Sequence, residues 1–328
     1  MKIAVLGAGA WGTTLARHLC DSGNDVTLWA HEPARLEEIR QFGENRRYLP
    51  GVRLPSAIKL EPDIHAAVSR AECVLVAVPS KVFRNITTHL REFDGIAVSV
   101  TKGIEYETCL TMSGILEENA PEARIASLSG PSIAPEVARG IPTAVVAASK
   151  CEKTAKTVQS LFHGNILRVY TSDDTIGVEL GGALKNVMAI AAGISDGLGF
   201  GDNSKSALLT RCLVEMRRLG VACGAKPETF FGLSGLGDLT VTFFSKLSRN
   251  RTFGERIGRG ESVSEILASM VNVVEGYPTT KAAYKLARKL NVYTPIIDEV
   301  YATLYEGKSP RQALIDLMNR DAKPENGI

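Results

Sequence analysis

The chain opens with KIAVLGAGAWG (residues 2–12), followed by TTLARHLCDSG (residues 13–23). The first five of these residues form the short apolar run that is typical of a strand buried on both faces of a parallel sheet. Glycines then recur in the spacing G-x-G-x-x-G, and the segment after them is helix-like. A strand that enters a helix through a glycine-rich turn predicts the first unit of a Rossmann-type α/β domain.

The three glycines each meet a different requirement of a dinucleotide site. Gly7 allows a tight turn, Gly9 lets a pyrophosphate approach the backbone, and Gly12 permits close packing of helix against strand. The helix N-terminus, at Ala10 and Trp11, would attract phosphates through its unpaired N–H groups. A glycine-rich turn without a ligand is the alternative, but a strand before the turn and a helix after it favour the dinucleotide site.

The composition is that of an ordinary globular protein of about two domains. Of the 328 residues, 45% are hydrophobic and 23% are charged, and the net charge is +2. A charge so close to balance predicts no nucleic-acid partner and no binding to an anionic membrane. The six cysteines form no C-x-x-C pair and the five histidines are scattered, so we expect free thiols and no metal site.

Targeting and membrane-spanning segments are not evident. Strand-like sequence begins at Lys2, which leaves no room for a signal peptide, and no uninterrupted apolar stretch reaches the roughly 18 residues of a spanning helix. We therefore expect a cytoplasmic protein without membrane insertion.

Strand-like and helix-like segments alternate over residues 1–172, and only helix-like segments follow over residues 173–328. The strand candidates are 2–7, 25–30, 72–79, 95–101, 124–129, 142–148 and 166–172. The helix candidates of the second part are 174–194, 203–222, 251–258, 262–270, 278–290, 295–306 and 310–319. We expect a Rossmann-type domain with a mostly parallel doubly wound sheet over 1–172. An all-helical domain over 173–328 would carry the substrate-binding and catalytic residues, with a frayed tail over about 321–328.

The end of the second strand bears on the choice between the two nicotinamide cofactors. NAD-selective sites place a carboxylate there to bind the ribose 2′-hydroxyl. This chain has Ala30 at that place, then His31, with Glu32 one or two positions late and Arg35 beyond. A missing carboxylate near basic groups accommodates a 2′-phosphate, so NADP is favoured over NAD. The alternative is that His31 is only a solvated loop residue.

Polar residues at strand ends and one isolated lysine are candidates for the chemistry. Lys102 follows one strand candidate and the segment 129–132 follows the next, at the edge where open α/β sheets bind ligands. Lys185 is the only ionisable residue in the apolar stretch 181–194. Burial lowers the pKa of an ammonium and suits it to proton transfer near neutral pH. A lysine that extends to the surface is the alternative.

A second polar cluster suits a phosphate. The segment 248–251 reads Ser-Arg-Asn-Arg, and Ser248 is a good N-cap for the helix after it. A hydroxyl, a guanidinium, an amide and free helix N–H groups are what a dianionic phosphate needs. An ordinary capped helix with exposed arginines fits the same residues. The glycine-rich run that contains Asp238 precedes this cluster.

Taken in order, these stretches resemble the bacterial NAD(P)-dependent sn-glycerol-3-phosphate dehydrogenase family. The resemblance extends over nearly the whole chain. It rests on GAGAWGTTLA (7–16), LWAHEP (28–33), VAVPS (76–80), TKGIE (101–105), SGPS (129–132), ELGGALKNVMAIAAGISDGLGFGDNSKSALLTR (179–211), GLSGLGDLTVT (232–242), SRNR (248–251) and VVEGYPTTK (273–281).

The resemblance implies roles for individual residues. Lys185 matches the catalytic proton donor and acceptor. Substrate-contacting positions are matched by Lys102, Gly130, Ser132, Lys185, Asp238, Ser248, Arg249 and Asn250. Cofactor-contacting positions are matched by Ala10, Trp11, His31, Tyr48, Lys102, Ala134, Arg249, Val273 and Glu275, beside the three glycines.

The reaction that the resemblance implies is the reversible reduction of dihydroxyacetone phosphate to sn-glycerol 3-phosphate, with NADP or NAD as cofactor. Lys185 would protonate the alkoxide, Lys102 would stabilise its charge, and the segment 248–250 would hold the phosphate. The resemblance also implies a homodimer, and a product that feeds phospholipid synthesis.

Two other functions fit parts of the sequence. A dehydrogenase of hydroxyacyl thioesters or hydroxy acids shares the two-domain plan, but the hydroxyacyl type relies on a His–Glu pair and no histidine follows His163. A dinucleotide-binding sensor without turnover needs only the N-terminal fingerprint. The presence of Lys185, Asp238 and the segment 248–250 argues against such a sensor. Absorbance of the reduced nicotinamide, with and without dihydroxyacetone phosphate, discriminates between these functions.

Overall fold

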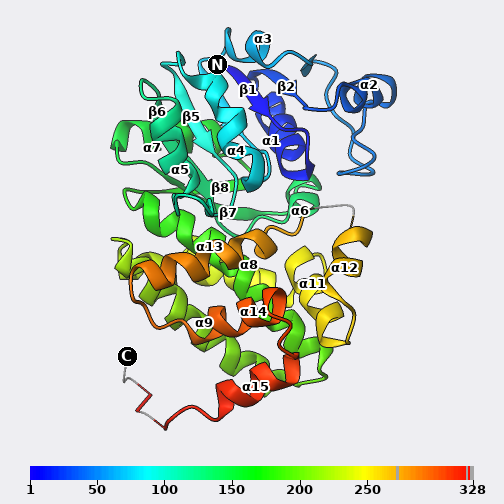
Figure 1. The fold of residues 1–328 in the computed structure, drawn as a ribbon. Helices are drawn as coiled ribbons and strands as arrows, with labels where there is room; N and C mark the ends of the chain where they lie inside the picture. Colours follow the sequence, from blue (N-terminus) through cyan, green and yellow to red (C-terminus); the bar gives the residue numbers. More distant parts are fainter. Residues whose placement is uncertain (271–272, 323, 326–328) are drawn as a thin grey trace.

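A computed structural model of the protein describes residues 1–270, 273–322 and 324–325, and Figure 1 shows a sheet half followed by a helical half. The strands of the sheet are β1 (Lys2–Leu6), β2 (Asp25–Trp29), β3 (Lys59–Glu61), β4 (Cys73–Val76), β5 (Ile96–Ser99), β6 (Arg124–Ser129), β7 (Thr143–Ala148) and β8 (Leu167–Ser172). Their order is β3-β2-β1-β4-β5-β6-β7-β8, and every neighbouring pair is parallel except β6–β7. The predicted mostly parallel, doubly wound sheet is confirmed.

Helices cover both faces of this sheet because its strands are apolar on both faces. Along β1, Ile3 and Val5 join one buried cluster, while Ala4 and Leu6 join another on the opposite face. The first cluster includes side chains of α1 and α7, and the second includes side chains of α4 and α5. The helices of this half are α1 (Ala10–Asp21), α2 (Pro33–Phe42), α3 (Ile64–Val68), α4 (Ser80–Thr87), α5 (Met112–Asn119), α6 (Ala134–Ala138) and α7 (Glu152–Phe162).

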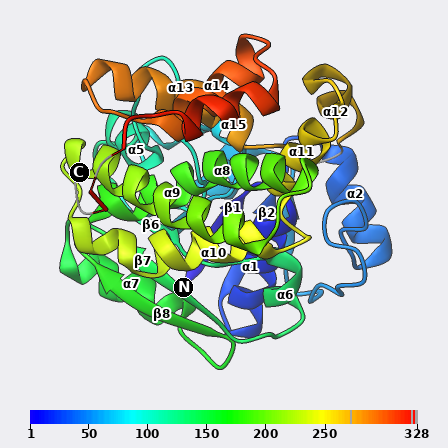
Figure 2. The ribbon, with the colours of Figure 1, turned by 90° about the horizontal axis from the view of Figure 1, so that it is seen from below.

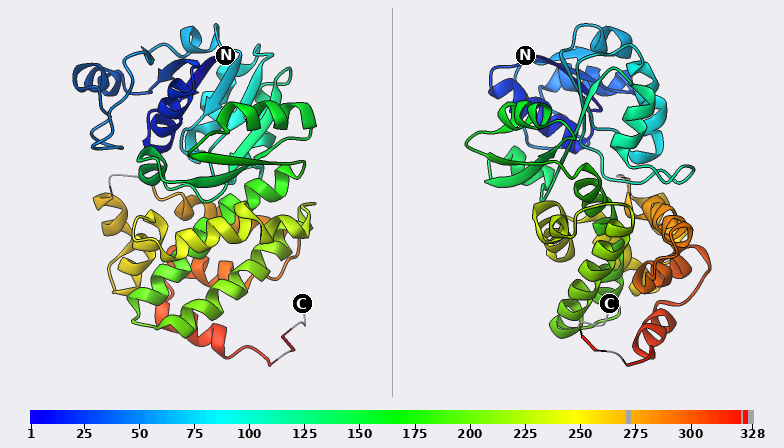
Figure 3. Two further views of the ribbon diagram at one scale, coloured as in Figure 1. Left: turned by 180° about the vertical axis from the view of Figure 1, so that it is seen from behind. Right: turned by 90° about the vertical axis from the view of Figure 1, so that its left-hand side faces the viewer.

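The second half is helical, and no strand follows β8 within the described residues. Its helices are α8 (Thr175–Gly197), α9 (Asp202–Ala222), α10 (Asp238–Phe244), α11 (Arg249–Gly258), α12 (Val263–Ser269), α13 (Gly276–Lys289), α14 (Pro295–Tyr305) and α15 (Pro310–Met318). Both views of Figure 3 show this bundle against one end of the sheet half.

Helix α8 is the centre of the helical half. It packs against α9, α10, α11, α13 and α14, and Figure 2 shows it among them. By length and composition α8 could cross a membrane, but 89% of its most apolar window is buried inside the protein. Apolar residues around the whole circumference are what a core helix requires.

Glycines let α11 cross α8 at close range, and this crossing places the N-terminus of α11. A Cβ atom at Gly193 of α8 would lie 2.0 Å from the carbonyl oxygen of Arg251. A Cβ at Gly254 of α11 would lie 2.1 Å from the carbonyl oxygen of Ile190. Any larger residue at either position would therefore push the two helices apart.

The structure differs from the sequence-based expectation mainly in short elements. The edge strand β3 and the helix α10 were not predicted, and α11 begins at Arg249 rather than at 251. A π-helical turn, Leu233–Gly237, leads into α10, so the glycine-rich run is helical despite its composition. In the predicted frayed tail, 323 and 326–328 lie outside the described residues, and Glu325 forms an ion pair with Arg211.

Candidate active site

Two segments far apart in sequence converge on the side chain of Lys102, just beyond the end of β5. Its ammonium Nζ lies 2.6 Å from Oδ2 of Asp238, the first residue of α10. The same Nζ donates to the carbonyl oxygen of Gly130 at 2.9 Å and to Oγ of Ser132 at 3.4 Å, both beyond the end of β6. The structure thus brings together four of the residues that the sequence singled out.

Lys185 approaches the same carboxylate from α8. Its Nζ lies 3.1 Å from Oδ1 of Asp238 and donates to Oγ1 of Thr242 at 2.8 Å. Lys185 is only 9% exposed and Asp238 only 1%. Two ammonium groups therefore lie on the two oxygens of one buried carboxylate, and the cluster keeps a net positive charge.

The surroundings of Lys185 change its proton affinity. Burial lowers the pKa of its ammonium to about 8, the negative charge of Asp238 opposes this effect, and the positive charge of Lys102 adds to it. A group with such a pKa holds and releases a proton near neutral pH. Lys185 can therefore act as a general acid or a general base toward an oxygen placed beside it.

The glycine pair of α8 lets the helix approach the strand ends. A Cβ atom at Gly182 would lie 2.6 Å from Oγ of Ser129 and 3.4 Å from Cγ of Lys102, and one at Gly181 would lie 2.5 Å from the carbonyl oxygen of Ser234. These contacts explain why a core helix contains two adjacent glycines one turn before Lys185. The close approach is what brings the lysines of the two halves onto one carboxylate.

The polar side chains at the N-terminus of α11 form hydrogen bonds within the protein. Ser248 is the N-cap, and its Oγ accepts the N–H of Arg251 at 3.3 Å. Arg249 is exposed and donates through Nη1 to the carbonyl oxygen of Val273 at 2.9 Å. The amide of Asn250 is buried: it donates to Oδ1 of Asn186 at 2.8 Å and accepts the N–H of Gly276 at 2.9 Å.

The glycine-rich loop fits a dinucleotide. Gly7 has φ +123°, and a Cβ there would lie 2.6 Å from the carbonyl oxygen of Ala77, so only glycine fits. A Cβ at Gly12 would lie 2.0 Å from the carbonyl oxygen of Gly7. At Gly9 it would meet no atom of the described residues within 4 Å. No side chain of the described part of the chain caps α1, so its first N–H groups are available to a pyrophosphate.

The end of β2 carries basic and aromatic side chains. Ala30 is buried, His31 is exposed, and the ring of Tyr48 has the guanidinium carbons of Arg35 and Arg47 each 5.3 Å from its centre. Glu38 forms an ion pair with Arg35, and Glu32 lies 3.5 Å from Arg35 and 3.9 Å from Arg47. Its carboxylate is thus already paired with arginines, which keeps the region suitable for an added negative charge.

The contacts of two further predicted cofactor residues, Ala134 and Glu275, differ: Ala134 contacts its own half of the protein, and Glu275 joins the two halves. Ala134 begins α6, and its carbonyl oxygen accepts the hydroxyl of Thr14 of α1 at 3.3 Å. Glu275, the residue before α13, accepts the N–H of Ser80 at 3.1 Å and its hydroxyl at 2.5 Å. Burial raises the pKa of Glu275, and the Ser80 hydrogen bonds and the charge of Arg249 oppose that rise.

Sequence reasoning did not single out three residues that organise these sites. Asn45 is buried and donates to the carbonyl oxygen of Ala8 and to Oγ1 of Thr13, at 2.8 Å each, and so holds the glycine-rich loop. Thr242 and Asn186 contact Lys185 and Asn250 as described above. The spacing of Thr242 four residues after Asp238 would have placed both on one face of a helix, had α10 been predicted.

Metal-binding side chains do not gather anywhere in the described ranges. Among those residues, no group of three or more histidine, cysteine, aspartate or glutamate side chains is placed to hold an ion.

A Rossmann-type sheet with this loop, and a buried lysine–carboxylate cluster beside it, are the features of nicotinamide-dependent dehydrogenases. Residues 2–155 match the family described as NAD-dependent glycerol-3-phosphate dehydrogenase N-terminus, and residues 174–315 match its C-terminus. The chain belongs to the family of NAD(P)+-dependent glycerol-3-phosphate dehydrogenases. It is therefore an oxidoreductase that acts on a CH–OH group with NAD or NADP.

Individual relatives match over the whole length. The glycerol-3-phosphate dehydrogenase [NAD(P)+] of Citrifermentans bemidjiense is 51% identical over 99% of this chain and 98% of its own. The enzyme of that name from Chlorobium phaeobacteroides is 50% identical over 100% of both chains. The crystal structure of glycerol-3-phosphate dehydrogenase from Coxiella burnetii matches with a TM-score of 0.94 and 38% identity, over 97% of this chain and 99% of that one.

Proposed function

We propose that the chain reversibly reduces dihydroxyacetone phosphate to sn-glycerol 3-phosphate and that the product supplies phospholipid synthesis. The observation that carries the chemistry is the pair of lysines, Lys102 and Lys185, on the two oxygens of the buried Asp238. The names of the relatives support glycerol 3-phosphate as substrate. The direction of the reaction and its metabolic use rest on the resemblance of the sequence.

Lys185 is the proposed catalytic acid and base. When bound, the nicotinamide exchanges a hydride with the central carbon of the substrate. The Lys185 ammonium gives a proton from Nζ to the carbonyl oxygen in reduction, and the neutral amine takes the hydroxyl proton in oxidation. Lys102 stabilises negative charge on that oxygen, and Asp238 holds both lysines in place. Gly130 and Ser132 fix Lys102 from the strand end and line the proposed substrate site.

The N-terminus of α11 is the proposed phosphate site. Arg249 offers its guanidinium, the hydroxyl of Ser248 can donate while its oxygen caps the helix, and Asn250 offers its backbone N–H. The amide of Asn250 is instead used between α8 and α13, which fixes the helix end that would bind the anion.

The glycine-rich loop and the N-terminus of α1 are the proposed pyrophosphate site, formed by Gly7, Gly9, Ala10, Trp11 and Gly12. The other proposed cofactor contacts are His31, Tyr48, Lys102, Ala134, Arg249, Val273 and Glu275. NADP is favoured, because the paired Glu32 and the arginines beside Tyr48 leave no free carboxylate there in the described residues.

Four further inferences accompany this function. The cofactor domain is taken to end at 172 and the substrate domain to begin at 173, supported by the end of β8 at Ser172. The resemblance supports a homodimer. Near-balanced charge supports the absence of a nucleic-acid partner. A cytoplasmic location without membrane insertion is supported by the burial of α8.

The direct experiment follows the reduced nicotinamide by absorbance after dihydroxyacetone phosphate is added, and then identifies the product. We expect substrate-dependent oxidation of NADPH with one sn-glycerol 3-phosphate formed for each nicotinamide oxidised. Oxidation that is as fast with unphosphorylated dihydroxyacetone would contradict the substrate assignment, and no oxidation at all would contradict the activity.

A further inference from the structure

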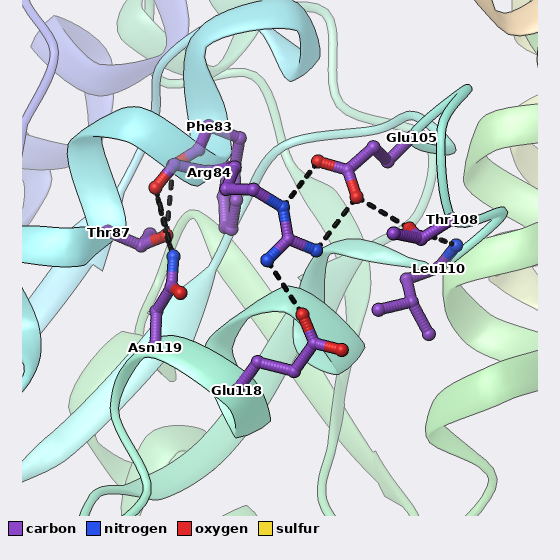
Figure 4. A network of polar contacts seen from close by, with 8 residues as sticks. All are labelled: Phe83, Arg84, Thr87, Glu105, Thr108, Leu110, Glu118 and Asn119. Carbon is purple, nitrogen blue, oxygen red and sulfur yellow. Dashed lines mark hydrogen bonds and ion pairs between the residues drawn. The ribbon is translucent and has the colours of Figure 1, made fainter.

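The connection from β5 to α5, residues 100–111, contains Lys102 near its start and is held at its middle by an arginine of α4. Figure 4 shows the guanidinium of Arg84 facing the carboxylate of Glu105. Nε donates to Oε1 at 2.7 Å and Nη2 donates to Oε2 at 2.8 Å, which is a two-pronged charge-assisted pair. The third nitrogen, Nη1, donates to Glu118 of α5 at 2.6 Å.

The two glutamates differ in their surroundings. The side chain of Glu105 is 12% exposed and that of Glu118 is 52% exposed. The side chain of Arg84 is 34% exposed, so its pair with Glu105 is partly buried. An exposed pair contributes little, whereas a partly buried two-pronged pair restrains geometry. The hydrogen bonds of Arg84 also keep the pKa of Glu105 below its usual value. Glu105 is thus the partner that fixes Arg84 to the connection.

Hydrogen bonds within the connection tie its other residues to Glu105. The Glu105 N–H donates to the carbonyl oxygen of Leu110 at 2.9 Å, and the Cys109 N–H donates to that of Glu105 at 2.9 Å. The hydroxyl of Thr108 donates to the Glu105 carboxylate at 2.5 Å. On the other side, Lys285 of α13 donates to the carbonyl oxygens of Tyr106 and Glu107. The internal contacts close the loop on itself, so it is held from outside by Arg84 through Glu105 on one side and by Lys285 on the other.

Helix α4 also holds the start of the connection. A Cβ atom at Gly103 would lie 2.5 Å from Cβ of Ser80, the first residue of α4, so the backbone beside Lys102 packs directly on that helix. Arg84 is one turn further along α4. Within the described residues, every hydrogen bond of the Lys102 ammonium goes to another segment. The position of its own backbone therefore depends on the contacts of the connection itself.

We propose that Arg84 and Glu105 are positioning residues for the reaction, which hold the connection so that the Lys102 ammonium meets Asp238 beside Lys185. This inference rests on the proposed function. Neither residue reaches the lysine–carboxylate cluster, so each acts only through the placement of Lys102.

The placement of Lys102 affects the pKa of Lys185. This effect distinguishes a positioning role of Arg84 and Glu105 from a role in stability alone. The charged groups that act on Lys185 are Asp238 of α10, Lys102 of the connection and Arg249 of α11. The positive charges of Lys102 and Arg249 lower the pKa of Lys185, and Asp238 raises it. If Lys102 moves away, the pKa of Lys185 rises and the rate profile moves to higher pH.

The test compares Glu105→Gln with the matched control Glu118→Gln, since each removes one carboxylate that pairs with Arg84. The measurements are kcat and KM, the pH profile of kcat, the affinity for the reduced dinucleotide by fluorescence, and the melting temperature. For Glu105→Gln we expect kcat to fall by about 10- to 100-fold, the scale of a misplacement of about 1 Å. We also expect the midpoint of the profile to move to higher pH, with dinucleotide affinity retained. The Glu118→Gln variant should match the wild type in kcat, KM, pH profile, dinucleotide affinity and melting temperature.

A second variant, Arg84→Lys, keeps the charge and loses the two-pronged geometry, and should give a smaller change of the same kind. A Glu105→Gln or Arg84→Lys enzyme that melts earlier but keeps the wild-type kcat and profile would overturn the proposal. So would equal effects of Glu105→Gln and Glu118→Gln. A wild type without turnover of either substrate would instead contradict the proposed function, so the two failures are distinguishable.

Discussion

The Lys185 ammonium lies between a carboxylate and a hydroxyl in a buried site, and its pKa of about 8 makes the direction of catalysis depend on pH. Reduction needs the protonated form and oxidation needs the neutral amine. As pH rises through about 8, kcat for reduction of dihydroxyacetone phosphate should therefore fall and kcat for oxidation of glycerol 3-phosphate should rise. Rates in both directions across this range check the prediction. Two profiles that change in the same sense would contradict it.

At the end of β2, a single side chain should change the choice of cofactor. Ala30 leaves the strand end without a carboxylate, so the wild type should use NADPH at least as efficiently as NADH. Ala30→Asp adds an acceptor for the ribose hydroxyls and repels a 2′-phosphate, so it should shift the ratio of kcat/KM values toward NADH. Steady-state kinetics with both cofactors measure this ratio. A wild type that uses NADH well and ignores NADPH would show the interpretation to be wrong.

Among the elements, α11 is the one expected to determine the substrate, because its N-terminus is the proposed phosphate site. Arg249→Ala removes one charge-assisted contact, so it should raise KM and lower kcat for the phosphorylated substrate. The loss in kcat/KM should correspond to about 1.5–3 kcal/mol, the scale of one hydrogen bond to a charged group. Unphosphorylated dihydroxyacetone is the control, since its poor turnover should change far less. Equal losses for both substrates would mean that Arg249 acts through the cofactor or the fold.

Helix α14 depends on a cap that comes from another helix. Glu215 of α9 is buried, and its carboxylate accepts the N–H groups of Ile296 at 2.9 Å and Ile297 at 2.8 Å. Glu215→Ala leaves both groups without this acceptor and should lower the free energy of unfolding by about 1–3 kcal/mol. Chemical denaturation measures the loss. The exposed Glu92, changed to alanine, is the control and should alter stability by less than about 0.5 kcal/mol. Equal losses in the two variants would rule out the capping role.

The elements that sequence patterns predicted are those with strong local signals. The long apolar run of α8 and the Val- and Ile-rich strands of the sheet were found, because burial on all sides leaves few polar positions. The edge strand β3 was not found, since three residues at a sheet edge carry almost no periodicity. Helix α10 was not found because the glycines before it predict a turn. Its preceding π-helical turn is stabilised by tertiary packing against Phe230, α8 and β7.

For the candidate site, the sequence indicated individual residues but not the side chains that they contact. Lys185 stood out by its isolation in an apolar stretch, and the structure places it on Asp238. The contact of Glu275 with Ser80 joins residues 195 positions apart, so local spacing could not indicate it. Asn250 shows the opposite case: its position near the α11 cap suggested a free amide, but tertiary packing turns the amide toward Asn186. Contacts of this kind depend on how α8, α11 and α13 cross, which spacing does not encode.

On the scale of the whole molecule, the two halves divide the work. The sheet half carries the glycine-rich loop, and the helical half carries Lys185, Asp238 and the N-terminus of α11. Lys102 of the sheet half contacts Asp238 of the helical half. We propose that dinucleotide binding and proton transfer are therefore separable, with Lys185 responsible for the second alone.

The most direct measurement of this claim is turnover and dinucleotide binding by Lys185→Met. Methionine fills the apolar path of the lysine side chain but cannot exchange a proton. We predict that fluorescence titration gives wild-type affinity for the reduced dinucleotide, while kcat falls by about 10²- to 10⁴-fold, the usual scale of general acid–base catalysis. Turnover near the wild-type rate would remove Lys185 from the mechanism, and a parallel loss of dinucleotide affinity would contradict the division of work between the halves.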